Sequence, residues 1–268
     1  MDKRIIAKTA IVLLWVANTC WTYECTNSSA TCKHKVAAAD SVESILKQLK
    51  QRASEIQSYQ GQVRYLFKQP LLESQSLRKG VLYYQKFGKK SKLRMNFDTL
   101  KQDDEEEQKY AEHFMFDGVW LTRIDYQIKA VESRQLAEPN EPVDAFELAS
   151  RSLPIIGFSK VEDLKKQFEI KLIPPAEAGS SPLVHLNLKV KPDSKYKDDY
   201  TSINFWIDRK LVLPAKVVAV TTEADVYEIH LLKPKVNEKM DEKVFEVEIP
   251  KGFTTERIPL KKAVKQEN

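Results

Sequence analysis

The chain has 268 residues, of which 42% are hydrophobic and 30% charged, and its formal net charge is +5. Residues 1–39 hold five Lys or Arg and two Asp or Glu, so residues 40–268 carry 38 and 36 and a net charge of +2. Nucleic-acid binders usually have a clustered basic surface; this near balance gives little support for one, and we expect no nucleic-acid partner. The seven glycines are too few to favour a phosphate-binding glycine loop or a flexible low-complexity segment.

Residues 1–39 are typical of an export signal. A basic start precedes the apolar stretch 10–17, which is too short to span a bilayer, and small residues follow it. The pattern favours cleavage after Ala39, although the residues around Ala30 fit nearly as well and those around Thr19 less well.

The cleavage position decides the fate of the three cysteines. All of them lie before Asp40, so cleavage after Ala39 leaves a mature chain with no disulfide and no reactive thiol, whereas cleavage farther upstream retains Cys20, Cys25 or Cys32. No linker or repeat interrupts the rest, and we expect one domain over residues 40–260 with a charged tail at 261–268.

The first expected element is an amphipathic helix over Asp40 to Ser58. Asp40 is the expected N-cap, with Glu43 at the third helical position. Apolar residues recur at helical spacing, which gives the helix one face that must be covered: Val42, Ile45, Leu46, Leu49, Ala53 and Ile56.

From Gly61 onward the hydrophobic period changes to two, and strand follows strand. The expected strands before the middle of the chain are 61–68, 80–87 and a return strand that contains Leu93, Met95 and Phe97. The acidic run Asp103 to Glu107 is expected to be a solvated loop, because a calcium-binding loop needs oxygen ligands spaced around a glycine.

A hairpin is predicted at His113 to Ile124, because Asp117-Gly118 between two β-prone runs favours a two-residue type I′ turn. That turn places Phe116 opposite Val119, Met115 opposite Trp120 and Phe114 opposite Leu121. Phe114, Phe116, Val119 and Leu121 then line one face, and Met115, Trp120, Ile124 and Tyr126 line the other. Both faces are apolar, so the second face requires a helix, another sheet, a partner or an apolar ligand to cover it.

Two segments after this hairpin break the strand pattern. Residues 144–151 are expected to form a short helix, and the apolar link 153–158 is expected either to plug the core or to act as a movable flap over a cavity. Strands then return; the apolar faces of the later ones include Val184 to Val190 and Ile203, Phe205 and Ile207. Roughly eleven strands with two or three helices predict a mainly β protein of the α+β class, with a large antiparallel sheet that is curled or closed.

No catalytic or metal-binding motif was found in the sequence. The chain lacks a Gly-x-Ser-x-Gly elbow, a phosphate-binding Gly-Lys-Ser/Thr loop, a His-Glu-x-x-His helix and a paired Cys-x-x-Cys. Of the histidines after residue 39, His113, His185 and His230 each fall on the more polar face of an expected strand. We favour the interpretation that these are ordinary surface histidines; the alternative is that the three converge on a zinc ion. We therefore expect no enzyme activity, no metal and no cofactor.

Several of these segments together resemble the LolA-like outer-membrane lipoprotein carriers. The resemblance covers nearly all of residues 40–260 and is carried by a capped helix followed by characteristic strand motifs: Gly80-Val81-Leu82-Tyr83-Tyr84, Lys92-Leu93-Arg94-Met95-Asn96-Phe97, Phe116-Asp117-Gly118-Val119-Trp120, Leu213-Pro214 and Phe245 to Phe253. It implies a periplasmic half-barrel whose concave apolar surface accepts acyl chains under a helical lid. The chain departs from the family at Gln85-Lys86-Phe87-Gly88, where the best-known carriers have an Arg-Pro pair that helps to gate the lid, and Lys86 lacks the planar multi-donor group of arginine.

The expected function is therefore that of an exported, monomeric, non-catalytic carrier of lipid or lipoprotein acyl chains, with membrane transfer proteins as possible partners. Three residues are expected on the lid: Leu148, Ile155 and Ile156. Eleven side chains are expected to line the cavity: Val63, Tyr65, Phe67, Leu93, Met95, Phe97, Met115, Trp120, Ile203, Phe205 and Ile207. The alternatives are a sensor or regulatory domain that binds a lipidated or membrane partner and an exported hydrolase.

Overall fold

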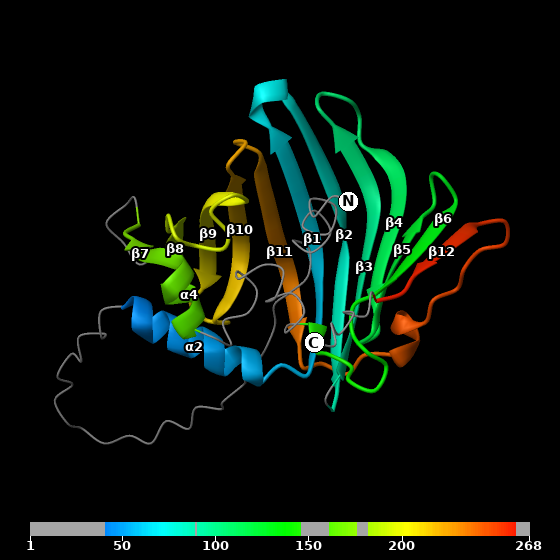
Figure 1. Cartoon of the computed structure of the whole chain (residues 1–268), viewed down its shortest axis with the longest axis horizontal. Helices are drawn as coiled ribbons and strands as arrows, with labels where there is room; N and C mark the ends of the chain where they lie inside the picture. The colour runs from blue at the N-terminus through cyan, green and yellow to red at the C-terminus, as the bar shows by residue number, and fades with distance from the viewer. Residues whose placement is uncertain (1–40, 89, 146–160, 176–181, 261–268) are drawn as a thin grey trace, which may run out of the picture.

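A computed structural model describes residues 41–88, 90–145, 161–175 and 182–260. Figure 1 shows one large curled sheet, with α2 and α4 on the side toward which it curls. The sheet contains twelve strands in the order β12-β6-β5-β4-β3-β2-β1-β11-β10-β9-β8-β7, and it is not closed between β12 and β7. Neighbouring strands are antiparallel except for β12, which pairs with β6 in parallel. The mainly β fold class expected from the sequence is confirmed.

The strands on the first half of the sheet follow one another as hairpins. They are β1 (Ser58–Gln69), β2 (Ser74–Phe87), β3 (Lys90–Gln102), β4 (Gln108–Phe116), β5 (Trp120–Asp125) and β6 (Ala130–Gln135). The 3-10 turn η1 (Pro70–Leu72) joins β1 to β2. The acidic run 103–107 is an exposed loop between β3 and β4, as expected.

The second half of the sheet is built in the same way. Its strands are β7 (Phe168–Ile173), β8 (Leu183–Val190), β9 (Tyr200–Asp208), β10 (Leu213–Thr221) and β11 (Val226–Val236). Because β11 pairs with β1, the two halves form one continuous sheet. A C-terminal segment, residues 237–260, follows with η3 (Glu242–Phe245) and the edge strand β12 (Thr254–Ile258).

The N-terminal helix α2 (Val42–Ser54) packs near the β7 edge together with α4 (Val161–Gln167). Its N-cap is Ser41, whose Oγ accepts a hydrogen bond from the backbone N of Ser44 at 3.1 Å. The prediction of Asp40 as the N-cap was therefore wrong by one residue. Ser41 is the cap because its hydroxyl accepts the otherwise unpaired N–H of Ser44 in the first turn. Four residues of the predicted apolar face are buried, Ile45, Leu46, Leu49 and Ile56, whereas Val42 and Ala53 are partly buried against the same core. None of the helices in the described part of the chain is long and apolar enough to cross a membrane.

The Asp117-Gly118 loop differs from the prediction by two residues of register. Phe116 lies opposite Leu121 and Met115 opposite Thr122, so the loop is longer than a two-residue turn. A type I′ turn requires positive φ at both central residues, yet of Asp117 and Gly118 only Gly118 has it. The Asp117 carboxylate instead accepts hydrogen bonds from the backbone N of Val119 and of Trp120. A shift of two residues leaves every side chain on its predicted face.

The two faces of this hairpin are covered by different parts of the molecule. We call the face that joins the core with α2 the inner face; Phe114, Phe116 and Leu121 lie on it. The opposite, outer face carries Met115 and Ile124. The C-terminal segment lies across this outer face, and Arg94 donates hydrogen bonds to the backbone carbonyls of Val244 and Glu246 in it. The second apolar face is thus covered by the chain's own C-terminus.

A half-buried histidine lies beneath the same C-terminal segment. His113 contacts the ring of Tyr126 at 4.8 Å between centroids, and Tyr126 in turn contacts Phe253. Its Nδ1 is buried and has no hydrogen-bond partner among the described residues. Burial, reinforced by the charge of Arg94, lowers the pKa of His113 from its usual 6.5 to about 4.

This depressed pKa predicts a loss of stability in mild acid. His113 binds its proton near pH 6.5 in the unfolded chain but only near pH 4 in the folded chain. The contribution of neutral His113 to the free energy of unfolding is therefore complete above about pH 6.5 and is lost as the pH falls toward 4. We expect about 2 kcal/mol to be lost between about pH 7 and about pH 4.5. The free energy of unfolding, measured with urea at about pH 7 and at about pH 4.5, should fall by about 2 kcal/mol less in His113→Phe than in the unchanged protein. An identical pH dependence in the two proteins would contradict the assignment.

Candidate functional site

The inner face of the sheet carries a continuous band of apolar side chains from β9 to β4. The alternation of each strand sends every second side chain to this face, and cross-strand register aligns them: Tyr65 pairs with Ile229, Ile229 with Val217, and Val217 with Phe205. The side chains on it are almost entirely buried and form one cluster with α2.

Nine of the eleven predicted cavity residues lie on this inner face, and Met115 and Trp120 lie on the outer one. Met115 is buried on the outer face, and the ring of Trp120 lies under the guanidinium of Arg257 from β12 at 4.0 Å. The structure therefore brings together Val63, Tyr65, Phe67, Leu93, Met95, Phe97, Ile203, Phe205 and Ile207. The predicted lid residues Leu148, Ile155 and Ile156 lie outside the described residues, as does most of the expected helix 144–151.

Aromatic rings cross the middle of the inner face. The ring centroids of Phe67 and Tyr227 lie 4.8 Å apart in a stacked arrangement, those of Tyr65 and Phe97 lie 6.1 Å apart, and Phe97 meets Phe114 edge-on at 6.3 Å. Burial raises the pKa of Tyr65 well above its usual value, so its phenol stays neutral. This central region therefore presents rings and uncharged hydroxyls.

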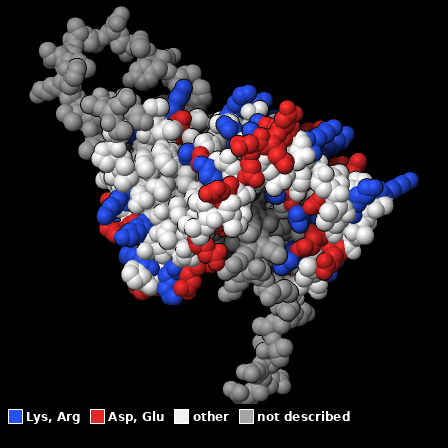
Figure 2. Space-filling view, turned by 90° about the horizontal axis from the view of Figure 1, so that it is seen from above, with Lys and Arg blue, Asp and Glu red and all other residues white. Residues whose placement is uncertain are grey.

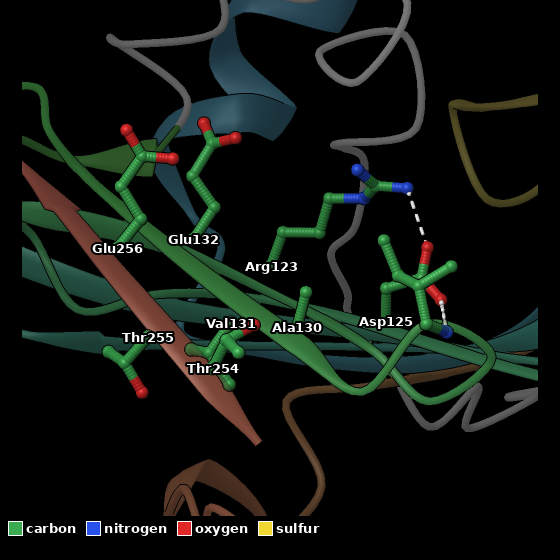
Figure 3. Close-up of a pocket in the computed structure, with 9 residues that line it drawn as sticks. Arg123, Asp125, Ala130, Val131, Glu132, Thr254, Thr255 and Glu256 are labelled. Carbon is green, nitrogen blue, oxygen red and sulfur yellow. Dashed lines mark hydrogen bonds and ion pairs between the residues drawn. The ribbon is translucent and has the colours of Figure 1, made fainter.

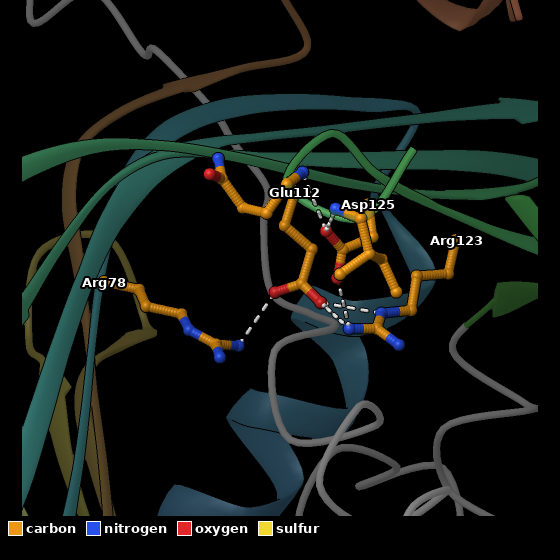
Figure 4. Close-up of polar contacts among 6 residues, drawn as sticks. Arg78, Glu112, Arg123 and Asp125 are labelled. Carbon is orange, nitrogen blue, oxygen red and sulfur yellow. Dashed lines mark hydrogen bonds and ion pairs between the residues drawn. The ribbon is translucent and has the colours of Figure 1, made fainter. Parts of the chain in front are cut away.

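A charged cluster borders the aromatic region on the same face (Figure 4). Glu112 is only 1% exposed, yet its carboxylate accepts hydrogen bonds from Arg78 Nη1 at 2.8 Å and from Arg123 Nε at 2.6 Å. Arg123 Nη2 also lies 3.0 Å from Asp125 Oδ2. The guanidinium of Arg78 lies over the rings of Phe97 and Tyr110. On the inner face, the buried charge of Glu112 on β4 therefore lies directly opposite the apolar ring of Phe97 on β3.

Sequence reasoning missed this cluster, although a signal for it was present. Glu112 is two residues before Phe114 and four before Phe116, so the strand alternation that places these rings on the inner face places Glu112 there too. A charged residue in phase with buried apolar ones requires an oppositely charged partner. The partners are Arg78 on β2 and Arg123 on β5.

A pocket of about 430 Å³ opens at the far side of the charged cluster, where β5, β6 and β12 meet (Figure 3). Six of the nine residues that line it are polar or charged, and three are apolar: Arg123, Asp125, Glu132, Thr254, Thr255 and Glu256, with Ile128, Ala130 and Val131. Figure 3 shows Arg123, Glu132 and Glu256 pointing to the same side of the sheet. The volume is within the range of small-molecule sites.

The three histidines considered for zinc do not meet. They lie on β4, β8 and β11, and His113 and His230 are four strands apart, which corresponds to about 19 Å. His230 Nε2 lies 2.6 Å from Glu228, and His185 stacks on Trp206. Within the described ranges no three side chains of the metal-binding types lie together.

Comparison with known proteins found similar solved structures and no match in sequence. No protein-family model matches the chain, and no curated protein matches it. An uncharacterized conserved protein from Thermus thermophilus is similar in structure at 11% identity and a TM-score of 0.47, covering 81% of this chain and 99% of that one. The MucA/MucB complex structure from Pseudomonas aeruginosa is similar at 13% identity and a TM-score of 0.43, covering 76% of this chain and 60% of that one.

A LolA superfamily protein from Nitrosomonas europaea is also similar, at 11% identity and a TM-score of 0.33, covering 78% of this chain and 99% of that one. The superfamily that the sequence motifs resemble is thus found among the similar structures. All three TM-scores are below 0.5, so the function has to be argued from the inner face itself.

Proposed function

We propose that the chain is an exported, non-catalytic carrier that holds acyl chains of lipids or lipoproteins against the inner face of its sheet in the periplasm. The observation that carries the proposal is the continuous apolar surface that spans β9 to β4 and is rich in aromatic rings. Burial of each methylene group contributes about 0.8 kcal/mol, so a sixteen-carbon chain offers on the order of 10 kcal/mol before ordering costs. The task requires no catalytic group.

The proposal includes the organisation of the chain. Residues 1–39 act as the export signal, residues 40–260 form the carrier domain, and the charged tail 261–268 follows. The carrier works as a monomer and exchanges its cargo with membrane transfer proteins. Its predicted lid residues, Leu148, Ile155 and Ile156, close over the acyl chains.

A matched pair of substitutions on β10 tests the use of the inner face. Val217 and Val218 are neighbours of similar, partial burial, but Val217 packs against the inner-face cluster and Val218 points to the outer face. A polar amide against an acyl chain costs about 1–2 kcal/mol, so Val217→Asn should weaken binding of a fluorescent fatty acid about tenfold. Val218→Asn should leave the affinity unchanged. Equal affinities for the two variants, with both folded by circular dichroism, would contradict the proposal.

A further inference from the structure

The turn between β1 and β2 exposes two neighbouring leucines. In η1, the side of Leu71 open to solvent amounts to 80% of the residue and that of Leu72 to 68%, and neither packs against the core cluster. Tight turns normally carry polar residues or glycine, because a turn lies in water. Two adjacent exposed leucines contribute little to the stability of this fold, and they form an apolar surface that a partner can cover.

The hairpin fixes the position of the two leucines at one end of the sheet. Its strands pair residue by residue from Ser58 with Gln85 up to Gln69 with Ser74. The turn is closed by the backbone N–H of Glu73, which donates to the carbonyl oxygen of Pro70 at 3.2 Å. Figure 1 shows this turn as the uppermost point of the sheet. The leucines therefore form a pre-organised projection, which is suited to enter a groove.

Acidic residues surround this projection. The loop after β3 is tied to the hairpin, because Asp103 Oδ1 accepts a hydrogen bond from the backbone N of Gln75 at 2.6 Å. On the other side, the turn between β10 and β11 lies beside Lys68, which pairs with Val226. Over residues 68–75, 101–106 and 222–225 the cations are Lys68 and Lys101. Seven anions oppose them, which we call the acidic collar: Glu73, Asp103, Asp104, Glu105, Glu106, Glu223 and Asp225.

The acidic collar decides which kind of partner fits. Figure 2 views the molecule from this end and shows acidic side chains gathered there. An anionic bilayer attracts basic segments and repels acidic ones, so the collar opposes insertion of the leucines into such a membrane. A protein groove with an apolar floor and a basic rim complements both the leucines and the collar.

We infer that Leu71 and Leu72 dock into an apolar groove, bordered by lysine or arginine, on a partner protein. The two leucines fill the groove, and the acidic collar meets its basic rim. The docking surface is at the end of the sheet and not on the inner face, so the inference does not depend on acyl-chain binding.

The test is photocross-linking of the full chain in its native host. A benzophenone amino acid replaces Leu72 in one variant and Ile128 in a control, because these residues are 68% and 69% exposed but Ile128 lies outside the collar. The Leu72 variant is also made with a reversal of collar charges, Glu105→Lys with Glu106→Lys. Its control is a reversal of exposed charges on the C-terminal segment, Glu238→Lys with Glu248→Lys.

The variant at Leu72 should give a protein product that the variant at Ile128 does not give. Mass spectrometry should place the cross-link in a peptide that contains lysine or arginine. Reversal of the collar charges should lower the yield about tenfold, because like charges then face each other, and the control reversal should leave it unchanged. A yield that survives the collar reversal, a product of twice the mass of this chain, or the absence of a protein product would overturn the inference.

A second measurement excludes the membrane as the partner. Vesicles of phosphatidylethanolamine and phosphatidylglycerol in equal amounts should not sediment the full chain. Sedimentation that is lost in Leu71→Ser with Leu72→Ser would overturn the inference and assign the leucines to a lipid surface. This double variant should bind a fluorescent fatty acid as the unchanged protein does, so a failure of the carrier proposal and a failure of the docking surface are separate results.

Discussion

Replacing Glu112 by alanine should destabilise the protein by about 3 kcal/mol. The carboxylate is buried and accepts hydrogen bonds from both Arg78 and Arg123. Its removal leaves two guanidinium groups on one face with their shared counter-ion gone, and breaking a buried ion pair on one side is strongly destabilising. The arginine side chains are 28% and 39% exposed, so water offsets part of the cost, and we place it at the low end of the usual range.

Glu132→Ala is the matched control for this experiment. Glu132 lies on the same face of the adjoining sheet region and pairs with Arg134, but its side chain is 38% exposed. An exposed pair contributes less than about 1 kcal/mol. Urea unfolding of the two variants at neutral pH should therefore separate them by about 2 kcal/mol. Similar losses in both would mean that the Glu112 cluster is no more important than a surface ion pair.

Gly80→Ala should lower the free energy of unfolding at least as much as Glu112→Ala does, by about 3 kcal/mol or more. A β-carbon at Gly80 would lie 1.8 Å from the backbone oxygen of Asn96, which cannot move without shifting β3. The contact occurs at a register irregularity between β2 and β3, where the strands approach closely. The absence of a side chain here also lets the rings of Tyr65 and Phe97 meet across β2.

Gly88→Ala tests whether the effect is steric. Gly88 has φ of +62°, but nothing lies within 4 Å of its added β-carbon. The cost of alanine there is only that of the left-handed conformation, about 1 kcal/mol. The Tm measured by circular dichroism should be far lower for Gly80→Ala than for Gly88→Ala. The reverse order would contradict the close approach of β2 and β3.

Local patterns were sufficient to predict most of the sheet, and the hairpin at Asp117 shows where they fail. Alternation identified both strands and both faces correctly because side chains repeat every two residues whatever the loop length. The register depended on the turn type, and the Asp117 carboxylate stabilises a longer loop by bonding to backbone groups ahead of it. The dipeptide alone does not distinguish the two turns.

Contacts between distant segments could not be predicted in the same way. The parallel pairing of β12 with β6 joins residues more than 120 positions apart, and the exposed sequence Thr254–Ile258 has no apolar alternation that marks it as a strand. For the same reason Met115 and Trp120 were assigned to the cavity: the contact of Trp120 with Arg257 of the C-terminal segment is not visible in the local pattern of the hairpin.

The most direct test of the account is titration of the full chain with a fluorescent fatty acid, together with mass spectrometry of the protein extracted from its native host. The carrier account predicts saturable binding with a blue-shifted emission, displacement by unlabelled fatty acid, and acylated molecules that co-purify with the protein. A folded protein that is recovered empty and never binds the probe would contradict it.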